Sequence, residues 1–265
     1  MKKLPTFFIS HGGGPWPYVP EMKTQFQKTA QWLQQLPQTL SETPKAILSI
    51  SGHWEESAFT VSTTAAPEMI FDYTGFPSHT YQIKYPVMGH PTIANDVLNL
   101  LSKAGIENHS DPNHGIDHGT FVPLVMMYPN ANIPVVSMSI KQNYDTEEHL
   151  QAGRALESLR SQGVLIIGSG LSYHNMRGFG SAGATAVSKN FGAWLESTVT
   201  EKDIQQRSEK LRSWALAPSA REAHPYEDHL VPLMIVAGAA GQDLGHAEFV
   251  DHVMGVDMAS YRFGT

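Results

Sequence analysis

The sequence predicts one α/β domain, in which a mostly parallel or mixed central sheet is flanked by helices and the active site lies at the carboxyl ends of strands. Three observations support this fold class. Short continuous apolar runs are typical of strands that are buried on both faces. They alternate with amphipathic segments of helical period. A chain of 265 residues with 41% hydrophobic residues can bury a large core as a single unit, residues 1–265.

The expected strands and helices follow one another along the chain, and no internal repeat or linker divides them. Four continuous apolar runs are expected to be buried strands: residues 6–10, 46–51, 133–140 and 164–167. Segments with apolar residues at helical spacing are expected to be helices: residues 21–36, 92–103, 147–161, 189–200 and the apolar stretch 230–240. Two segments, 59–62 and 80–85, alternate more strongly and are expected to be edge strands or a hairpin.

The composition excludes several classes of function. The formal net charge is 18 − 25 = −7 and no run of Lys or Arg exceeds two residues, so the clustered basic side chains of a nucleic-acid-binding surface are missing. The absence of cysteine excludes disulfides, thiolate metal sites and cysteine nucleophiles. The apolar runs are too short for a signal peptide or a membrane span. A soluble, cytoplasmic protein with a small-molecule substrate is therefore expected, and its oligomeric state stays open.

Three predicted strands end in polar segments that are flanked by glycine. These segments are Ser10-His11-Gly12, Ser51-Gly52-His53 and Gly168-Ser169-Gly170, the last of which leads to His174. In open α/β sheets, ligands bind outside the carboxyl ends of the strands. We therefore expect His11, His53 and His174 to converge on one crevice, although they are far apart in the sequence.

The flanking residues divide the 13 histidines into candidates for chemistry and ordinary histidines. His11 precedes three glycines, where the missing Cβ atoms let a ligand approach, and is expected to bind a metal unless it is a turn residue bonded to a carbonyl. His53 repeats this arrangement, with Trp54 as an apolar wall. Six others are expected to lie at the surface or to make local hydrogen bonds: His79, His90, His109, His149, His246 and His252.

A second group of candidate ligands precedes the apolar helix near the C-terminus. The segment from Ala223 to His229 contains two histidines and two carboxylates. Neutral imidazole is the commonest protein ligand of metals, which favours His229, pointing from the first helical turn into the crevice. Glu227 and Asp228 are better explained as charges that complement the helix macrodipole, although a carboxylate in the metal sphere stays an open alternative.

Two further histidines are candidates for a role beside the metal. His174 follows the strand 164–167, and a histidine that is near a metal but not bound to it can act as general base and acid. His114 and His118 have the i, i+4 spacing of a helical zinc pair, but Gly115 and the absence of Glu after His114 weaken that signal. We expect His118 to donate a hydrogen bond on the substrate side and Asp117 to orient a neighbour.

Six short motifs occur in series from His11 to about Gly241: Ser10-His11-Gly12; Ser51-Gly52-His53-Trp54; Phe71-Asp72-Tyr73 with Gly75-Phe76-Pro77; Asp117-His118-Gly119-Thr120; Gly168-Ser169-Gly170 with His174-Asn175; and His224 through Pro232. In this order they resemble the DOPA-type branch of the class III extradiol ring-opening dioxygenases, the superfamily of the LigB catalytic subunit. Each motif alone is loose, but six in series are specific.

The resemblance implies a role for each candidate residue. His11, His53 and His229 match metal ligands, whereas many extradiol enzymes use two histidines and one carboxylate. His174 matches the acid/base histidine that does not bind the metal, and His118 matches a histidine of the substrate pocket. Three further residues are expected beside the substrate: Tyr73, Asp117 and Trp54.

The resemblance also implies the reaction and its metal. A catechol, DOPA-like, is opened with dioxygen next to its diol to a semialdehyde acid, while His174 takes a phenolic proton and later returns it. Fe(II) is expected for activity because oxygen chemistry needs a redox metal. A three-histidine set also suits Zn(II), and the DOPA-type branch is often described with zinc.

Three other functions compete with this interpretation. The principal alternative is a zinc-dependent hydrolase that uses the same histidines with a metal-bound water. A serine esterase is suggested by His11-Gly12-Gly13-Gly14, but the nearest nucleophile elbow, residues 170–174, has histidine in place of its last glycine. A nucleotide-binding module at residues 168–170 lacks the full glycine fingerprint and a phosphate-binding lysine.

Overall fold

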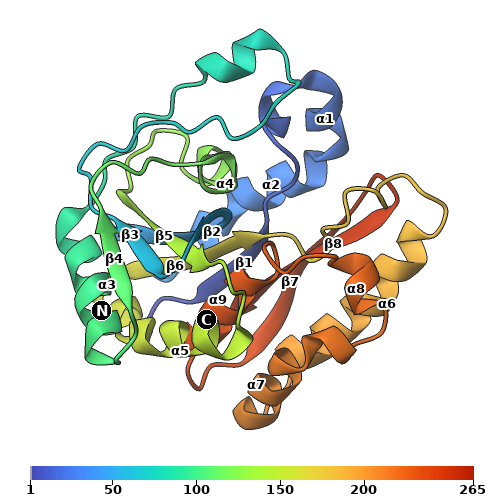
Figure 1. Ribbon diagram of the computed structural model, residues 1–265. Helices are drawn as coiled ribbons and strands as arrows, with labels where there is room; N and C mark the ends of the chain where they lie inside the picture. Colours follow the sequence, from blue (N-terminus) through green and yellow to red (C-terminus); the bar gives the residue numbers. More distant parts are fainter. Residues whose placement is uncertain (1) are drawn as a thin grey trace.

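A mixed sheet of eight strands runs through the computed structural model, which describes residues 2–265 (Figure 1). The strands are β1 (Thr6–Ser10), β2 (Ala46–Glu56), β3 (Phe59–Ser62), β4 (Asn108–Asp111), β5 (Val135–Lys141), β6 (Val164–Gly170), β7 (Gly245–Val253) and β8 (Val256–Phe263), in the spatial order β4-β3-β5-β2-β6-β1-β8-β7. The four central strands, β5-β2-β6-β1, are parallel. On either side, β3 is antiparallel to β5 and β8 is antiparallel to β1. The predicted α/β domain with a mixed sheet is confirmed.

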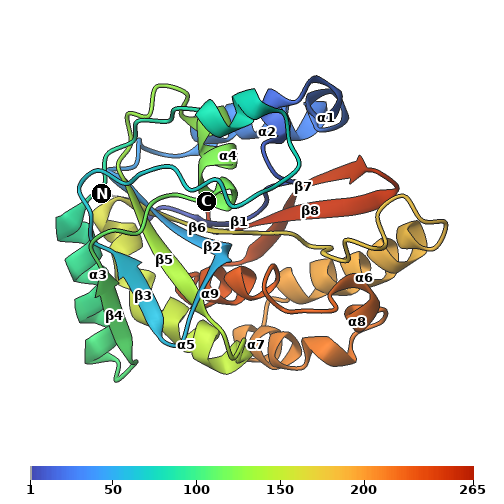
Figure 2. The same cartoon turned by 45° about the horizontal axis from the view of Figure 1, so that its top comes forward.

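Helices cover both faces of this sheet. They are α1 (Pro20–Gln25), α2 (Gln27–Gln35), α3 (Pro91–Lys103), α4 (His118–Met127), α5 (Thr146–Leu156), α6 (Ala184–Val199), α7 (Ile204–Arg212), α8 (Ala220–Ala223) and α9 (Val231–Ala239). Figure 2 shows α4 and α2 on one face, and α9, α5 and α6 on the other. Every residue of α9 is buried, because this helix lies between the sheet and α5 and is apolar all round. Within residues 2–265, no helix is both long and apolar enough to cross a membrane.

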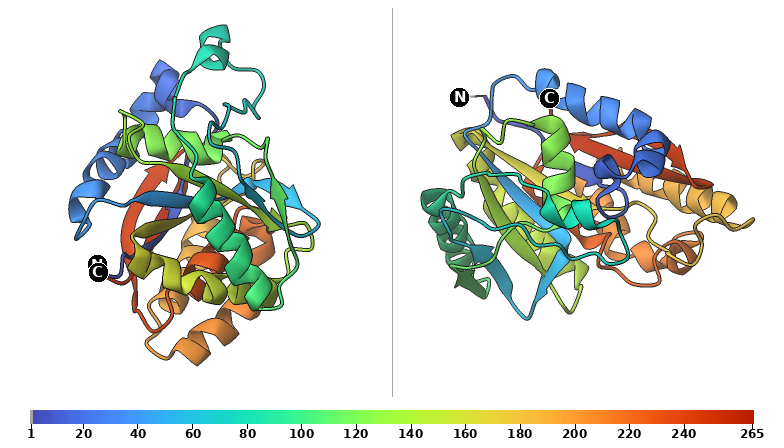
Figure 3. Two further views of the ribbon diagram at one scale, coloured as in Figure 1. Left: turned by 90° about the vertical axis from the view of Figure 1, so that its left-hand side faces the viewer. Right: turned by 90° about the horizontal axis from the view of Figure 1, so that it is seen from above.

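The two chain termini lie at the same edge of the sheet, away from the carboxyl ends of the parallel strands. β1 and β8 are paired in opposite directions, with Thr6 opposite Phe263, and the left view of Figure 3 shows both ends of the chain on the same side of the molecule. The carboxyl ends of β1 and β6 are therefore free of the termini, and they open toward the loops that precede α4 and α9.

Several expected elements differ from those of the structure. The helix expected over residues 21–36 is interrupted at Phe26, which separates α1 from α2. The strand expected over residues 80–85 is wrong, because Ser78–Gln82 form a 3₁₀ helix in which the Thr80 hydroxyl bonds to the Pro77 carbonyl. Residues 83–87 keep an alternating burial that resembles a strand, but within the described chain no ladder includes them.

Candidate functional site

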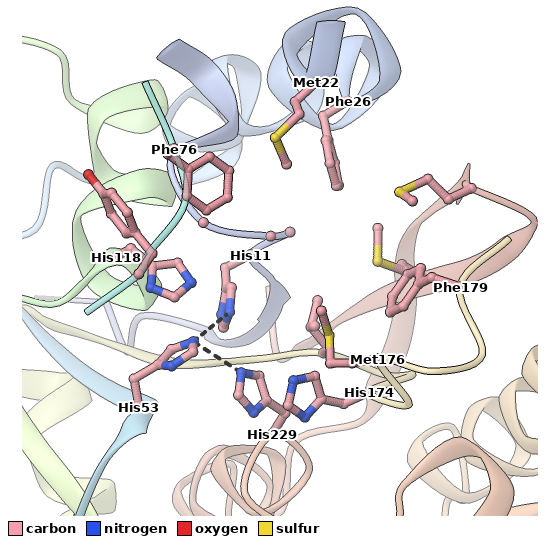
Figure 4. Close-up of a pocket in the computed structure, with 17 residues that line it drawn as sticks. His11, Met22, Phe26, His53, Phe76, His118, His174, Met176, Phe179 and His229 are labelled. Atoms are coloured by element: carbon pink, nitrogen blue, oxygen red, sulfur yellow. Dashed lines mark hydrogen bonds between the residues drawn. The ribbon is translucent and has the colours of Figure 1, made fainter. Parts of the chain in front are cut away.

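Five segments of the chain bring one histidine each to the carboxyl edge of the parallel strands (Figure 4). His11 directly follows β1, and its backbone N–H donates to the carbonyl of Gly170 at the end of β6. The sequence had suggested that His53 lies beyond the end of a strand, but it lies within β2, because β2 continues to Glu56. The register of β2 against β5 shifts between Ile50 and Glu55. His229 precedes the first turn of α9.

Two glycines let β2 and β6 approach the loop that carries His229. A Cβ atom at Gly170 would lie 2.1 Å from the carbonyl oxygen of His229, and one at Gly52 would lie 2.7 Å from that of Asp228. Any other residue would push this loop away from the strand ends. The absence of side chains here is therefore what allows His229 to reach His11 and His53.

The Nε2 atoms of three histidines lie close together. His53 Nε2 lies 3.2 Å from His11 Nε2 and 3.0 Å from His229 Nε2. Two nitrogens that both bind one ion at 2.0–2.1 Å, at tetrahedral or octahedral angles, are roughly 2.8–3.4 Å apart. The spacings of His53 Nε2 from the other two nitrogens therefore fit a metal ion of this kind, and His11, His53 and His229 each offer a ligand nitrogen within 4.8 Å of those of the other two.

The Nδ1 atom of each of these rings faces an acceptor. His11 Nδ1 lies 3.0 Å from Ser169 Oγ, whose own proton is donated to the Gly119 carbonyl. His229 Nδ1 lies 2.7 Å from Asp228 Oδ2, and His53 Nδ1 lies 3.3 Å from Asp72 Oδ2. An acceptor at Nδ1 keeps the proton on that nitrogen and leaves the lone pair on Nε2. Three lone pairs then face one another, an arrangement that a bound cation would stabilise.

Burial keeps these histidines neutral. The pKa values of His11 and His53 are well below the ordinary value, because desolvation and the neighbouring imidazoles oppose a positive charge. Desolvation also lowers the pKa of His229 to about 4, although the hydrogen bond to Asp228 acts in the opposite direction. Neutral imidazole is the form that binds metals, so the three rings are ready to bind a metal at neutral pH.

Two carboxylates connect His53 and His229 to two other histidines. Asp72 also accepts from His118, whose Nδ1 lies 2.8 Å from Oδ2, and Asp228 also faces His174, whose Nδ1 lies 3.3 Å from Oδ1. Burial alone would raise the pKa of both carboxyls, but the hydrogen bonds from His118, His174 and His229 outweigh it and lower both pKa values. Each carboxylate therefore stays ionised and holds two rings.

His174 and His118 lie beside the three-histidine cluster and not within it. The ring of His174 stacks on that of His229, with centroids 3.5 Å apart, and its Nδ1 contact with Asp228 leaves Nε2 for a group in the cavity. His118 is the first residue of α4, and its ring centroid lies 4.0 Å from that of His53. Both side chains face the same cavity.

The five histidines lie at the floor of a cavity of about 500 Å³. Its walls come from the glycine-rich loop after β1, from α1 and its junction with α2, from the loop around Phe76, from the segment after β6 and from the β7–β8 hairpin. The remaining lining residues are Gly12, Gly13, Gly14, Met22, Phe26, Tyr73, Phe76, Leu171, Met176, Phe179, Met254 and Met258. A cavity of this size is typical of small-molecule sites.

Of the three residues expected beside the substrate, only Tyr73 lines the cavity. Its hydroxyl donates to the Thr80 carbonyl at 2.6 Å, and burial raises its pKa to about 12. Trp54 follows His53 on a strand whose side chains alternate between faces, so it points away and stacks on His114 at 3.4 Å. Asp117 is buried behind the floor, where it accepts from the Ser51 hydroxyl and the Thr120 N–H.

The environment of Asp117 differs from that of an ordinary helix cap. Its side chain caps the first turn of α4, as Asp does at many helix N-termini. Burial and the charge of Asp72 raise its pKa to about 6, although hydrogen bonds to Ser51 and Thr120 act in the opposite direction. Asp117 therefore caps the start of the helix whose first residue is His118.

Asp72 and Asp228 are the site residues that sequence reasoning missed. Asp228 was explained as a helix charge, and Asp72 was quoted only as part of a motif. Glu227, the other carboxylate considered as a ligand, bonds instead to Arg221 at 2.8 Å. A signal existed for both missed residues, because metal-bound histidines usually donate their second nitrogen to a carboxylate or carbonyl.

Comparisons with known proteins find related proteins over nearly the whole chain. Residues 5–262 match the family model described as the catalytic LigB subunit of aromatic ring-opening dioxygenase. A protein of Beta vulgaris named 4,5-DOPA dioxygenase extradiol is 36% identical over 97% of this chain and 94% of its own length. Dioxygenase tasH of Hapsidospora irregularis is 36% identical over 100% of this chain and 86% of its own. The crystal structure of an uncharacterized protein from Escherichia coli K12 has a TM-score of 0.79 and 26% identity, covering 98% of this chain and 100% of that one.

Proposed function

The chain belongs to the family of the catalytic LigB subunit of aromatic ring-opening dioxygenases, and from this premise we propose that it opens catechols at a three-histidine Fe(II) site, with residues 1–265 as one catalytic domain. Metal-dependent extradiol cleavage of an aromatic ring with dioxygen follows from the family and from the relatives named as extradiol dioxygenases. The same comparisons do not favour a zinc-dependent hydrolase. To this family-level activity the proposal adds the identity of the metal, the catechol diol of the substrate and the role of each residue.

The observation that carries the proposal is the close approach of the Nε2 atoms of His11, His53 and His229, each of which has an acceptor at its Nδ1. His11, His53 and His229 would hold the metal through these nitrogens. When bound there, Fe(II) would supply the redox chemistry that dioxygen requires and would acidify the diol hydroxyls. Because the three ligands are neutral, the full charge of a divalent ion is left to attract a catecholate. Zn(II) suits the same donors and would occupy the site without supporting oxygen chemistry.

His174 is proposed as the residue that moves the proton. It lies at the cavity, and its Nδ1 is held by Asp228, so Nε2 can take a proton from the second diol hydroxyl and return it to the product. Asp228 stabilises the positive charge that the ring carries between these steps. Proton transfer by a positioned side chain typically contributes ~10²–10⁴-fold to the rate.

The remaining residues orient the substrate or support the ligands. The Nδ1 atom of His118 is held by Asp72, so we propose that its Nε2 hydrogen-bonds to the substrate diol. Tyr73 contributes only its ring to the wall, because its hydroxyl donates its proton to the Thr80 carbonyl. We propose that Asp117 and Trp54, which lie behind the floor, position His118 and β2 and do not touch the substrate.

The proposed function is tested by anaerobic reconstitution. The metal-free protein is loaded with Fe(II) or Zn(II), and dioxygen uptake is recorded with a catechol. We expect uptake and a ring-opened semialdehyde with Fe(II), and no uptake with Zn(II). Hydrolysis of an ester or amide with Zn(II), together with no uptake with Fe(II), would contradict the proposal and revive the zinc hydrolase.

Replacing Asp228 by asparagine is expected to weaken metal binding about 10–100-fold, the usual cost of losing a carboxylate that orients a metal-binding histidine. The loss arises because an amide would no longer hold the Nδ1–H of His229 in the same way. The affinity is measured by competition with a chelator. Glu227→Gln is the matched control, since Glu227 bonds to Arg221 at the protein surface, and it should leave the affinity unchanged. Equal effects of the two substitutions would contradict the assigned role of Asp228.

A further inference from the structure

Above its histidine floor, the cavity is lined almost entirely by apolar side chains. Three phenylalanines, four methionines and Leu171 form most of its wall, and Figure 4 shows Met22, Phe26, Phe76, Met176 and Phe179 around the space in front of the histidines. Apolar walls gain free energy from the apolar surface that a ligand buries against them. Methionine side chains also adapt their shape to the group that they contact. The upper cavity therefore suits a bulky apolar group of variable shape.

The same walls offer no oppositely charged side chain to a charged group. Among residues 2–265, no Lys, Arg, Asp or Glu side chain lines the cavity. Asp72 and Asp228 lie behind the histidines and already bond to them. A carboxylate or ammonium that enters an apolar site without a partner loses its hydration and gains little in return. The formal net charge of −7 further disfavours anionic ligands.

The rim continues the apolar character of the wall out to the solvent. Met176 is 67% exposed and Met254 is 50% exposed, and both line the cavity. Arg177 is exposed in the adjoining depression, which it shares with Met176 and His174, and it does not line the main cavity. A substituent that extends from the histidine floor toward the solvent would therefore meet mainly the apolar side chains of the wall and then these two methionines.

We propose that the substrate is a catechol whose ring carries a bulky, apolar and uncharged substituent, in preference to one that carries a carboxylate or an amino acid group. This inference rests on the proposed catechol cleavage, because the diol must face the histidines for the substituent to face the apolar wall. It keeps the catechol that the sequence suggested but departs from the DOPA-like side chain. DOPA itself carries both a carboxylate and an ammonium group, and it is expected to be a poor substrate.

The test compares two catechols of similar length that differ in terminal charge. These are 4-butylcatechol and 3-(3,4-dihydroxyphenyl)propanoate, used with the Fe(II)-loaded protein. We expect kcat/KM for the alkyl compound to be higher by about 100-fold or more. In the series from 4-methylcatechol to 4-butylcatechol, kcat/KM should rise roughly three- to fourfold with each methylene. Dissociation constants measured without dioxygen should follow the same order.

A substitution at the rim tests the physical cause of the preference. Met176→Arg places a cation at the mouth of the cavity and should raise kcat/KM for the propanoate, relative to 4-butylcatechol, by about 10-fold or more. Met88→Arg is the matched control, because Met88 is 56% exposed and does not line the cavity. It should leave both values unchanged, which separates a local contact from a general change of net charge.

One result would overturn the substrate inference, and another would overturn the proposed function. If the unmodified protein binds and cleaves the propanoate or DOPA as well as 4-butylcatechol, the inference is wrong, and the backbone amides of Gly12–Gly14 become the candidate receptor for the carboxylate. If neither catechol supports dioxygen uptake, the proposed function fails. The dissociation constants measured without dioxygen then still report whether the cavity prefers apolar substituents.

Discussion

Replacing His53 by alanine is expected to abolish metal binding and ring cleavage together. His53 Nε2 is the nitrogen within 3.2 Å of both other Nε2 atoms, so its loss leaves two donors that cannot enclose an ion. We expect the affinity for Fe(II) or Zn(II) to fall by more than about 10³-fold, beyond the 10–100-fold that the loss of a supporting residue costs. Turnover should fall to background, as measured by dioxygen uptake.

Thermal unfolding provides a second readout for His53→Ala. A metal that binds only the folded protein stabilises it by about 2.7 kcal/mol at 100 times its Kd. Addition of Zn(II) should therefore raise the Tm of the unmodified protein by several degrees and should not change that of the variant. Without metal, the variant should be at least as stable, because one of three facing lone pairs is gone.

The control for this experiment is a histidine far from the cluster. His109 lies on the edge strand β4 with a side chain that is 58% exposed, so His109→Ala should keep the metal affinity and the activity. A His53→Ala protein that still binds one metal ion with similar affinity would contradict the three-histidine site. In that case the other clusters, such as His174 with Asp228 and His229, would have to hold the ion.

The approach of His11 to His53 could be predicted from the sequence. Each histidine lies near the carboxyl end of a continuous apolar run, and such runs form parallel strands of one sheet whose carboxyl ends share one edge. The position of His229 was harder to predict, because it depends on close backbone contacts with Gly52 and Gly170. These contacts join segments far apart in the chain, so the sequence indicated His229 only through its residue type, its place before the apolar helix and the order of motifs.

Asp72, Asp228 and Trp54 show that local sequence patterns do not reveal contacts between distant segments or the face of the sheet to which a side chain points. Asp228 precedes a helix, so its position has an ordinary local explanation that hides its contacts with His174 and His229. Asp72 lies in an irregular loop, whose path no periodicity describes. Trp54 was expected beside the substrate because β2 was thought to end before it. The strand instead continues, and its alternation turns Trp54 away from the cavity.

Part of the sheet was also not predicted, for a related reason. Continuous apolar runs indicate strands that are buried on both faces, whereas β7 is an edge strand with exposed positions along its length. Its hairpin partner β8 contributes Met258 to the cavity, and Met254 lies in the turn between them. The missed hairpin therefore supplies part of the wall on which the substrate inference depends.

Replacing His174 by alanine is expected to slow turnover while leaving the metal in place. His174 does not belong to the group of three Nε2 atoms, and Asp228 can still hold His229 through its 2.7 Å contact. We expect kcat to fall about 10²–10⁴-fold, the usual contribution of a positioned acid/base group, with the metal content near that of the unmodified protein. The measurements are dioxygen uptake under single-turnover conditions and metal analysis of the same sample.

Added imidazole separates proton transfer from a structural role of His174. The alanine substitution leaves space beside His229, where a free imidazole can replace the missing ring and restore part of the rate. His174→Phe fills the same space with a ring that cannot carry a proton, so its activity should stay low with or without imidazole. If His174→Ala releases the metal, His174 is a ligand and not the proton carrier. If His174→Phe instead retains full activity, the ring acts only by stacking on His229, and another group must move the proton.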